Sequence, residues 1–427
     1  MLFGWKHLKQ EELERIARGI VENRIYGGPW HLELQPTNHC NLDCVFCCTK
    51  PQRHGQVLPW EKLEGVLREA AARNLRFLRL SGGGEGLLYP AIRPLLDLCG
   101  ELGIRIVDLT TNATLLEPFA RELIEIGVDY VLLSFNECDP RRYAETMRTT
   151  ERMFHQGVRG IEALCAARDA GPTENRPKID LQLVVWRSNW RHLHAMYEFG
   201  LTLPVDRILL KSLMLLPDAE RIPPEDIPTI KGLLVELIEE DCRSGRYKLA
   251  FDLSKESDLN HFAYTEQVKR LPPGMKLGPD FVKTNPREEY CYMGWYSATV
   301  TAEGDVHPCC VMSGMRGREF GNILREPLDS IWRGAGFRRF RNEIRNLMLL
   351  DGNLEFSRRF THYLEPPCID CFGCQWGFLL CSPEFYREVA TRMRQETSWA
   401  ERGLARTKNT LIKTLRRARR AVRRTYS

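Results

Sequence analysis

The sequence lacks any long apolar run. No uninterrupted hydrophobic stretch in the 427 residues approaches the roughly 20 residues needed to cross a bilayer. The opening segment MLFGWKHLKQEELER meets charged residues before an apolar stretch typical of a secretion signal could form. Hydrophobic residues make up 43% and charged residues 27% of the chain, which excludes a collagenous, disordered or disulfide-stabilised miniature protein. We therefore expect a packed protein in the cytoplasm.

Acidic residues are absent from the carboxyl-terminal end. Residues 402–427 contain ten Lys and Arg and no Asp or Glu, although the whole chain has a net charge of only +5. Apolar residues recur there at helical spacing, which predicts a basic amphipathic helix in a tail that we place at 386–427. Such a helix binds anionic membrane surfaces or nucleic-acid phosphates, and peripheral placement at a membrane is then expected. A solvated, frayed chain end explains the same composition.

The length predicts two or three domains, or one α/β barrel with additions. Short apolar runs alternate with stretches of helical periodicity. The expected strands are 31–35, 76–80, 105–109, 130–134, 179–185 and 207–210. The expected helices between and after them include 59–73, 91–102, 117–126 and 224–242. Six consecutive βα units predict a parallel sheet curled into a partial barrel, with functional residues at the carboxyl ends of the strands.

Changes in composition divide the chain into five parts. We expect an amino-terminal helical segment at 1–30, the α/β part at 31–250, a linker rich in Pro, Gly and charge at 251–290, a cysteine-rich domain at 291–385 and the basic tail. Within the cysteine-rich domain, the run YSATVTAEGDVHP predicts a β-hairpin. No internal repeat is present.

Fifteen cysteines are many for a reducing compartment, where clustered cysteines are typical of metal ligands or catalytic thiols. Cys40, Cys44 and Cys47 follow the first expected strand with CxxxCxxC spacing. Three thiolates leave one coordination position open, either on zinc or on an iron-sulfur cluster. Recruitment of Cys48 as a fourth ligand would instead give a structural zinc site.

The second expected strand ends in LSGGGEGLL. Gly83 and Gly84 would let the backbone approach a ligand closely, and Glu85 adds a carboxylate. A simple turn between strand and helix explains the glycines as well. The run matches neither the dinucleotide fingerprint nor the phosphate-binding loop.

Taken together, these motifs resemble the radical S-adenosylmethionine (SAM) superfamily. The resemblance covers about residues 30–215 and includes the aromatic Phe46 before the last cysteine of the motif. It implies a partial (β/α)6 barrel and a 4Fe-4S cluster held by Cys40, Cys44 and Cys47, whose fourth iron binds S-adenosylmethionine. An electron donor such as flavodoxin or ferredoxin would drive cleavage to methionine and a 5′-deoxyadenosyl radical, which abstracts hydrogen from substrate. The cofactor supplies the radical chemistry, and the protein supplies orientation.

The resemblance also implies contacts to the cofactor. Gly83, Gly84 and Glu85 would bind its amino group, and Phe46 would lie near its adenine. Asn112 and Ser134, at the ends of the third and fourth strands, would contact ribose or carboxylate. Alternatively, Asn112 bonds its own backbone, and Ser134 caps the next helix. Further candidates of the same kind follow strands five and six: Arg187, Asn189 and Lys211.

A second group of cysteines resembles the SPASM/twitch extension of radical SAM enzymes. The resemblance implies that Cys291, Cys309, Cys368 and Cys371 hold one auxiliary 4Fe-4S cluster, with Gly304 in the turn of the hairpin. The later cysteines do not reproduce the spacing of a second auxiliary cluster. They could complete another site or pack as small buried hydrophobes, and they are Cys310, Cys374 and Cys381. A zinc ribbon explains paired cysteines as well.

These motifs predict a radical SAM enzyme acting on a small molecule, such as a sugar, aminocyclitol or nucleoside, with oxidation or epimerisation as the outcome. Only about thirty residues precede the first strand, which argues against a separate domain for recognising a leader peptide. A peptide or RNA maturase is the alternative in the same class. A non-enzymatic zinc protein that binds nucleic acid is the alternative from another class. The sequence identifies no catalytic acid or base.

Overall fold

The computed structural model describes residues 2–47, 49–50, 53–172, 176–212, 221–253, 257–272, 275, 292–313, 317, 319–348 and 383–396. Within these ranges ten strands form one sheet, in the order β10-β9-β8-β1-β2-β3-β4-β5-β6-β7. The strands are β1 (His31–Leu34), β2 (Phe77–Leu80), β3 (Arg105–Thr111), β4 (Tyr130–Ser134), β5 (Lys178–Val185), β6 (Arg207–Ser212), β7 (Leu249–Asp252), β8 (Ser297–Val300), β9 (Asp305–His307) and β10 (Gly321–Asn322).

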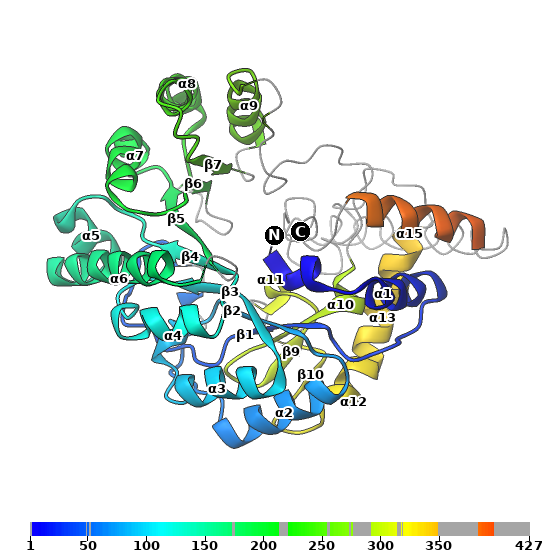
Figure 1. Ribbon diagram of the computed structural model, residues 1–427. Helices are drawn as coiled ribbons and strands as arrows, with labels where there is room; N and C mark the ends of the chain where they lie inside the picture. Colours follow the sequence, from blue (N-terminus) through cyan, green and yellow to red (C-terminus); the bar gives the residue numbers. More distant parts are fainter. Residues whose placement is uncertain are drawn as a thin grey trace, which may run out of the picture.

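Helices cover the outer side of the curved sheet (Figure 1). Those of the α/β part are α2 (Trp60–Ala72), η3 (Gly86–Leu88), α3 (Ile92–Leu102), η4 (Glu117–Phe119), α4 (Ala120–Glu125), α5 (Pro140–Met147), α6 (Glu151–Ala170), η6 (Trp190–His192), α7 (Leu193–Thr202), η8 (Pro224–Asp226), α8 (Ile227–Arg243) and α9 (Ser257–Val268). The others are η1 (Leu2–His7), α1 (Gln10–Glu22), α10 (Met293–Tyr296), α11 (Cys310–Ser313), α12 (Leu328–Arg333), α13 (Ala335–Met348) and α15 (Pro383–Glu396). Within the described ranges, every helix is too short or too polar to span a lipid bilayer.

All six expected strands are present and pair in parallel with their neighbours along the chain. The predicted parallel α/β sheet is therefore confirmed. The sequence analysis missed β7, which extends the sheet beyond β6 in parallel. β7 has only four residues and follows a charged segment, so its period-2 signal was too short to recognise.

The predicted hairpin is confirmed as β8 and β9, which pair antiparallel. Its turn is closed by a hydrogen bond from the amide of Gly304 to Thr301 O at 2.9 Å. Gly304 has a φ of +81°, which a residue with a side chain rarely adopts. β8 also pairs in parallel with β1, so the cysteine-rich part adds its strands directly to the sheet of the α/β part.

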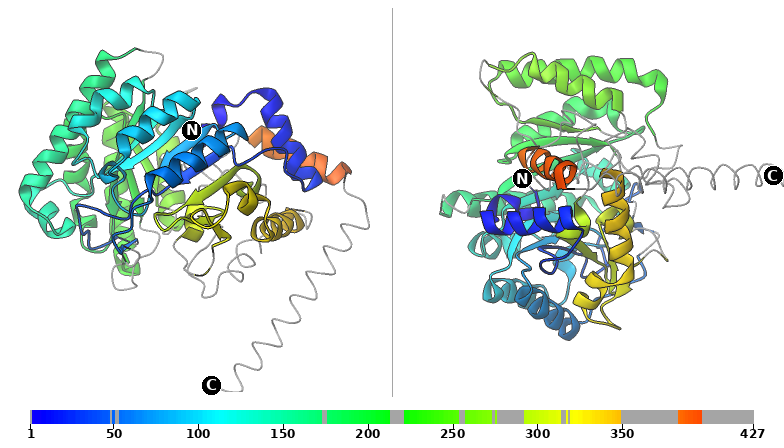
Figure 2. Two further views of the ribbon diagram at one scale, coloured as in Figure 1. Left: turned by 90° about the horizontal axis from the view of Figure 1, so that it is seen from below. Right: turned by 90° about the vertical axis from the view of Figure 1, so that its right-hand side faces the viewer.

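Two segments differ from the expected boundaries. The expected linker at 251–290 contains α9, whose Leu259 and Ala263 are buried and whose Gln267 amide donates to Leu249 O at 2.9 Å. The start of the expected tail is part of α15, which lies beside α1 (Figure 2). Apolar residues of α15 are buried in a core shared with α1 and α13. Both segments have an apolar side that packs against the rest of the protein. The charged residues between the apolar ones hid this pattern in the sequence.

The sheet separates an apolar outer side from a more polar inner side. Along β1, Leu32 and Leu34 belong to the core under the helices, while His31 and Glu33 lie on the opposite side. This follows from the alternation of side chains along a strand. Polar residues of successive strands therefore lie together on the inner side. This side adjoins the carboxyl ends of the strands, where functional residues were expected.

Candidate functional site

The loop between β1 and α2 carries Cys40, Cys44 and Cys47. The amides of Asp43 and Val45 donate to backbone carbonyls at the end of α5, Met147 O at 3.0 Å and Thr146 O at 2.9 Å. These bonds attach the loop to the last turn of α5. The three cysteines are partly exposed free thiols, so the loop presents them where a bound group can reach them.

The three thiols are not arranged as ligands of a single ion. Within the described residues, no three His, Cys, Asp or Glu side chains are close enough together to hold one metal ion. A 4Fe-4S cluster fits a wider set of thiols, because each cysteine binds a different iron. Burial raises the pKa of Cys40, and it raises that of Cys44 to about 12, with further contributions from the neighbouring thiolates. Metal binding must therefore displace protons.

Polar groups lie close to two of the thiols. Arg53 Nη2 lies 2.6 Å from Cys47 Sγ, Thr49 Oγ1 lies 3.2 Å from the same sulfur, and Asn112 Nδ2 lies 3.9 Å from Cys40 Sγ. The sequence analysis did not anticipate Arg53 or Thr49. Their position in the cysteine loop, within six residues of Cys47, was the available signal, since a cationic donor suits anionic sulfur. The Thr49 hydroxyl donates its proton to Gly83 O at 2.8 Å and so links the cysteine loop to the glycine segment.

The glycine-rich segment after β2 packs directly against the cysteine loop. Gly84 N donates to Thr37 O at 3.0 Å and Glu85 N donates to His39 O at 2.8 Å. A Cβ at Gly84 would lie 1.8 Å from His39 O, so only glycine fits there. The two motifs that sequence analysis grouped are thus joined by backbone hydrogen bonds.

The Glu85 carboxylate is buried and engaged within the protein. It accepts from Thr111 Oγ1 at 2.9 Å, from Asn112 N at 2.8 Å and from Leu87 N at 3.2 Å. Burial raises its pKa, while these hydrogen bonds act to lower it. A carboxylate has about four acceptor positions, so the protein itself takes most of them. The carboxylate organises the loop, and a contact to a cofactor amino group stays a prediction.

Of the two other expected contacts, Asn112 bonds the cysteine loop and Ser134 bonds within its own segment. Asn112 Oδ1 accepts from Thr114 N at 3.1 Å, the backbone bond considered as an alternative, and its amide also donates to Asn41 Oδ1 at 2.8 Å. Ser134 accepts from Asn136 Nδ2 at 3.0 Å. Capping of the next helix by Ser134 is wrong, because Asp139 caps α5.

The residues after β5 and β6 have different surroundings. The ring of Phe46 lies 4.8 Å from that of Trp186, which links the cysteine loop to the end of β5 and was not anticipated. The side chain of Asn189 bonds Trp186 N at 2.9 Å and Val184 O at 2.8 Å, so it shapes the turn. Arg187 is exposed. Lys211 lies on the inner side and pairs with Asp252 at 3.6 Å.

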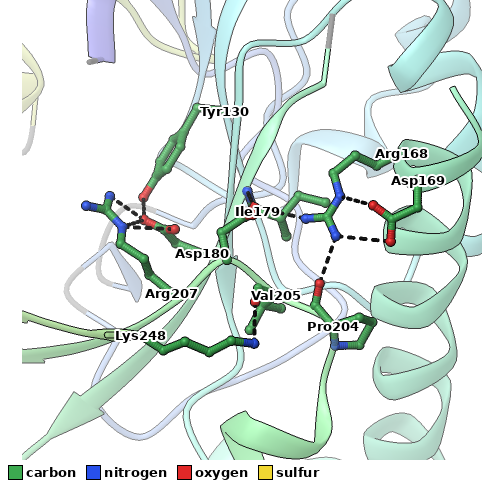
Figure 3. A network of polar contacts seen from close by, with 10 residues as sticks. Tyr130, Arg168, Asp169, Ile179, Asp180, Pro204, Val205, Arg207 and Lys248 are labelled. Atoms are coloured by element: carbon green, nitrogen blue, oxygen red, sulfur yellow. Dashed lines mark hydrogen bonds and ion pairs between the residues drawn. The ribbon is translucent and has the colours of Figure 1, made fainter. Parts of the chain in front are cut away.

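Buried charges line the inner side of the sheet. Arg79 lies 3.3 Å from Glu33 and 3.4 Å from Asp108, and all three are at most 3% exposed. Further along the sheet, Asp180 accepts from Tyr130 at 2.8 Å and from Arg207 at 2.6 Å, on the left of Figure 3. Burial raises the pKa of Glu33 and Asp108, and the guanidinium of Arg79 opposes this shift.

The cysteine-rich part contributes α11 to the same region. The side chain of Cys310 hydrogen bonds with Glu33, and Gln35 Nε2 donates to Ser313 Oγ at 3.2 Å. Cys309 is partly exposed and packs against the core shared by α1, α13 and α15. The other cysteines of the expected auxiliary site lie outside the described residues, namely Cys291, Cys368 and Cys371, and so do Cys48, Cys374 and Cys381.

Family profiles agree with these features. Residues 34–172 match the Radical SAM superfamily, and residues 291–372 match SPASM, an iron-sulfur cluster-binding domain. The chain belongs to the radical SAM superfamily and carries a SPASM domain. The cofactors are therefore S-adenosylmethionine, a 4Fe-4S cluster and auxiliary iron-sulfur chemistry, as the resemblance implied.

Similar curated proteins share the name GTP 3′,8-cyclase. That of Pelotomaculum thermopropionicum is 37% identical over 28% of this chain and 38% of its own length. GTP 3′,8-cyclase 1 of Pseudomonas aeruginosa is 30% identical over 41% of this chain and 52% of its own length. A probable GTP 3′,8-cyclase of Methanosarcina acetivorans is 24% identical over 71% of this chain and 83% of its own length. The chain spans about half, or less, of the length of the first two.

Solved structures share the fold. The anSMEcpe protein with bound AdoMet and the Cp18Cys peptide has a TM-score of 0.55 at 16% identity, covering 85% of this chain and 99% of that one. Streptococcus suis SuiB bound to S-adenosylmethionine has a TM-score of 0.51 at 19% identity, and the match covers 78% of this chain and 72% of SuiB. At such identities the likeness shows the architecture alone.

Proposed function

We propose that this radical SAM enzyme abstracts hydrogen from a small-molecule substrate of the sugar, aminocyclitol or nucleoside type, and that oxidation or epimerisation follows. The 4Fe-4S cluster, when bound by Cys40, Cys44 and Cys47, supplies the electron that cleaves S-adenosylmethionine. Radical SAM enzymes need a reductant, and flavodoxin or ferredoxin would serve. The polar inner side of the sheet, beside the cysteine loop, is the observation that supports this proposal.

The inner side offers acceptors for a substrate rich in hydroxyl or amino groups. Asp108 Oδ2 and Gln182 Oε1 are buried and have no hydrogen-bond partner among the described residues. Two hydroxyl oxygens are likewise buried without a hydrogen-bond partner among the described residues: Thr299 Oγ1 in β8 and Thr301 Oγ1 directly after it. A buried acceptor without a partner costs about 1–3 kcal/mol, so a donor group from a substrate would stabilise it. Hydroxyl groups of a sugar or ribose provide such donors.

The placement of the cysteine-rich part supports an oxidative outcome. β8 lies beside β1, and α11 reaches Gln35 at the carboxyl end of β1. Cys309, an expected auxiliary ligand, begins the same segment. An auxiliary cluster there would stand near the barrel interior and could accept the electron released when a substrate radical is oxidised.

Relatives favour different substrates. The similar curated proteins are named for a nucleotide, GTP, which agrees with the nucleoside class. Two structural neighbours were solved with peptides, and peptide maturation is therefore the second candidate. Sequence similarity reaches 37% in the first group, whereas the structural likeness reflects architecture alone, so we favour a small molecule.

Hydrogen transfer tests the proposal. Anaerobically reconstituted, reduced enzyme is incubated with S-adenosylmethionine and deuterated sugars, aminocyclitols or nucleosides, and 5′-deoxyadenosine is analysed by mass spectrometry. We expect deuterium in 5′-deoxyadenosine from one of these classes, and no 5′-deoxyadenosine from the Cys44→Ala variant. Label from a deuterated peptide alone would replace the small-molecule proposal with peptide maturation. Cleavage by the Cys44→Ala variant would refute the ligand assignment.

A further inference from the structure

The guanidinium of Arg53 is directed at a sulfur ligand of the proposed cluster. Its Nη2 donates to Cys47 Sγ at 2.6 Å, and its Nη1 donates to Leu42 O at 2.7 Å. The two bonds join the beginning and the end of the cysteine motif. One side chain therefore fixes the position of Cys47 relative to the rest of the loop.

Arg53 differs from the other cations at this loop. Lys50 and Arg148 both pair with the Asp43 carboxylate, at 2.6 and 3.3 Å. Among the described residues, Arg53 has no carboxylate partner, and its buried Nε has no acceptor. Its positive charge is thus balanced by sulfur instead of by an acid.

The charge of Arg53 persists in this environment. Burial acts to lower its pKa, but the thiolates of Cys47 and Cys40 outweigh burial and hold the pKa above its ordinary value. A guanidinium stays protonated in proteins in any case. The loop therefore places a permanent, partly buried cation against a sulfur that becomes anionic on metal binding.

A second buried polar group, the hydroxyl of Tyr143, lies within electrostatic range of the cysteine motif. The Tyr143 hydroxyl is fully buried and has no hydrogen-bond partner among the described residues. Burial raises its pKa first, and the negative charges of Cys44, Cys40 and Glu85 raise it further. An unsatisfied buried hydroxyl beside the cysteine motif fits a site that holds anionic sulfur.

We propose that Arg53 is a positioning residue that makes one-electron reduction of the SAM-binding cluster easier. This inference rests on the proposed ligand set of Cys40, Cys44 and Cys47. The potential of an iron-sulfur cluster depends on net charge, on hydrogen bonds to its sulfurs and on exposure. When an external one-electron donor adds an electron, the cluster gains one negative charge, and the nearby guanidinium stabilises that added charge. The electron comes from a low-potential donor, and no proton moves.

Redox titration of the full-length, reconstituted enzyme tests this inference. Dithionite-poised samples are followed by electron paramagnetic resonance, using the signal that changes when S-adenosylmethionine is added. Arg53→Met removes charge and donor, Arg53→Gln keeps an N–H donor without charge, and Arg53→Lys keeps the charge. Lys50→Met removes an exposed cation of the same loop and serves as the control.

We expect Arg53→Met to reduce the equilibrium constant for one-electron reduction at least tenfold, which corresponds to about 59 mV. Arg53→Lys should restore most of the loss, Arg53→Gln should restore less, and Lys50→Met should match the wild type. If Arg53→Met does not retain a cluster, the comparison of Arg53→Gln with Arg53→Lys still decides whether charge matters. Equal potentials in those two variants and the wild type would overturn the inference.

Other outcomes separate this inference from the proposed function. An unchanged potential with weakened binding of S-adenosylmethionine would assign Arg53 to the cofactor and overturn a role in reduction. A wild-type enzyme without any signal that responds to S-adenosylmethionine would refute the ligand set itself, and the proposed function with it. A normal wild-type signal whose potential is insensitive to Arg53 would refute only the role of Arg53.

Discussion

Substitution of Gly84 by Ala should disrupt the contact between the two motifs of the cofactor site. The new Cβ would lie 1.8 Å from His39 O, and real Cβ contacts are essentially never below 3.0 Å, so the backbone must move by about 1.2 Å. The neighbouring atom is a backbone carbonyl, which has no rotamer that could relieve the contact.

The expected cost follows from what that movement breaks. Two backbone hydrogen bonds flank the contact, from Gly84 N to Thr37 O and from Glu85 N to His39 O. Each contributes roughly 0.5–1.5 kcal/mol, and overpacking adds about 1–3 kcal/mol. We therefore expect Gly84→Ala to lower the free energy of unfolding by about 2–6 kcal/mol, with a displaced cysteine loop.

Gly86 provides the matched control in the same segment. A Cβ at Gly86 would meet nothing within 4 Å, so Gly86→Ala should retain wild-type stability and iron content. Urea unfolding of the metal-free proteins measures the stability, and iron analysis after anaerobic reconstitution measures the site. If Gly84→Ala and Gly86→Ala unfold at the same urea concentration and bind equal iron, the packing argument is wrong.

Three further predictions concern other parts of the molecule. Cys309→Ala should lose about four irons per chain and still release 5′-deoxyadenosine, because the SAM-binding cluster is separate; equal iron content would exclude Cys309 as a ligand. Arg79→Met should lower the free energy of unfolding by about 3–5 kcal/mol, because Glu33 and Asp108 lose their buried counter-ion; an unchanged urea midpoint would contradict this. Burial raises the pKa of Glu137 from 4.5 to about 7, so its stabilising contribution is complete below pH 4.5 and is lost as pH rises through 7. Glu137→Gln should therefore remove a pH-dependent change in stability of about 3 kcal/mol between pH 4.5 and 8, measured by denaturation at each pH.

The six strands that carry the site could be predicted from the sequence. Each expected strand combines β-branched or leucine-rich residues with a following turn, and burial on the outer side preserves this pattern, as in Leu32 and Leu34 of β1. The cysteine motif and the glycine segment were also recognised, because their spacing is local. Their direct contact through Gly84 and His39 was beyond local analysis, since it depends on the register between β1 and β2.

Most features that could not be predicted from the sequence are contacts whose partners only the fold brings together. Arg53 is one cation among several near the cysteines, and only the fold shows that Lys50 pairs with Asp43 while Arg53 reaches Cys47. Likewise, α15 contains three Arg and three Glu and looks highly charged along the chain, yet its apolar side docks on α1. Charge counts describe composition, whereas pairing depends on which elements the sheet brings together.

The pairing of β8 with β1 has a consequence for how the two iron-sulfur regions act together. β1 leads directly into the cysteine loop, and its Gln35 side chain bonds Ser313 of α11 across the end of the strand. α11 begins at Cys310, next to the expected auxiliary ligand Cys309. Because burial of one face of a strand specifies its register, and Ala298 and Val300 of β8 lie in the same core as Leu32 and Leu34 of β1, β8 holds α11 in place relative to the cysteine loop. The sheet therefore links the cysteine loop to the segment that carries Cys309, which would suit electron transfer that depends on a fixed separation between centres.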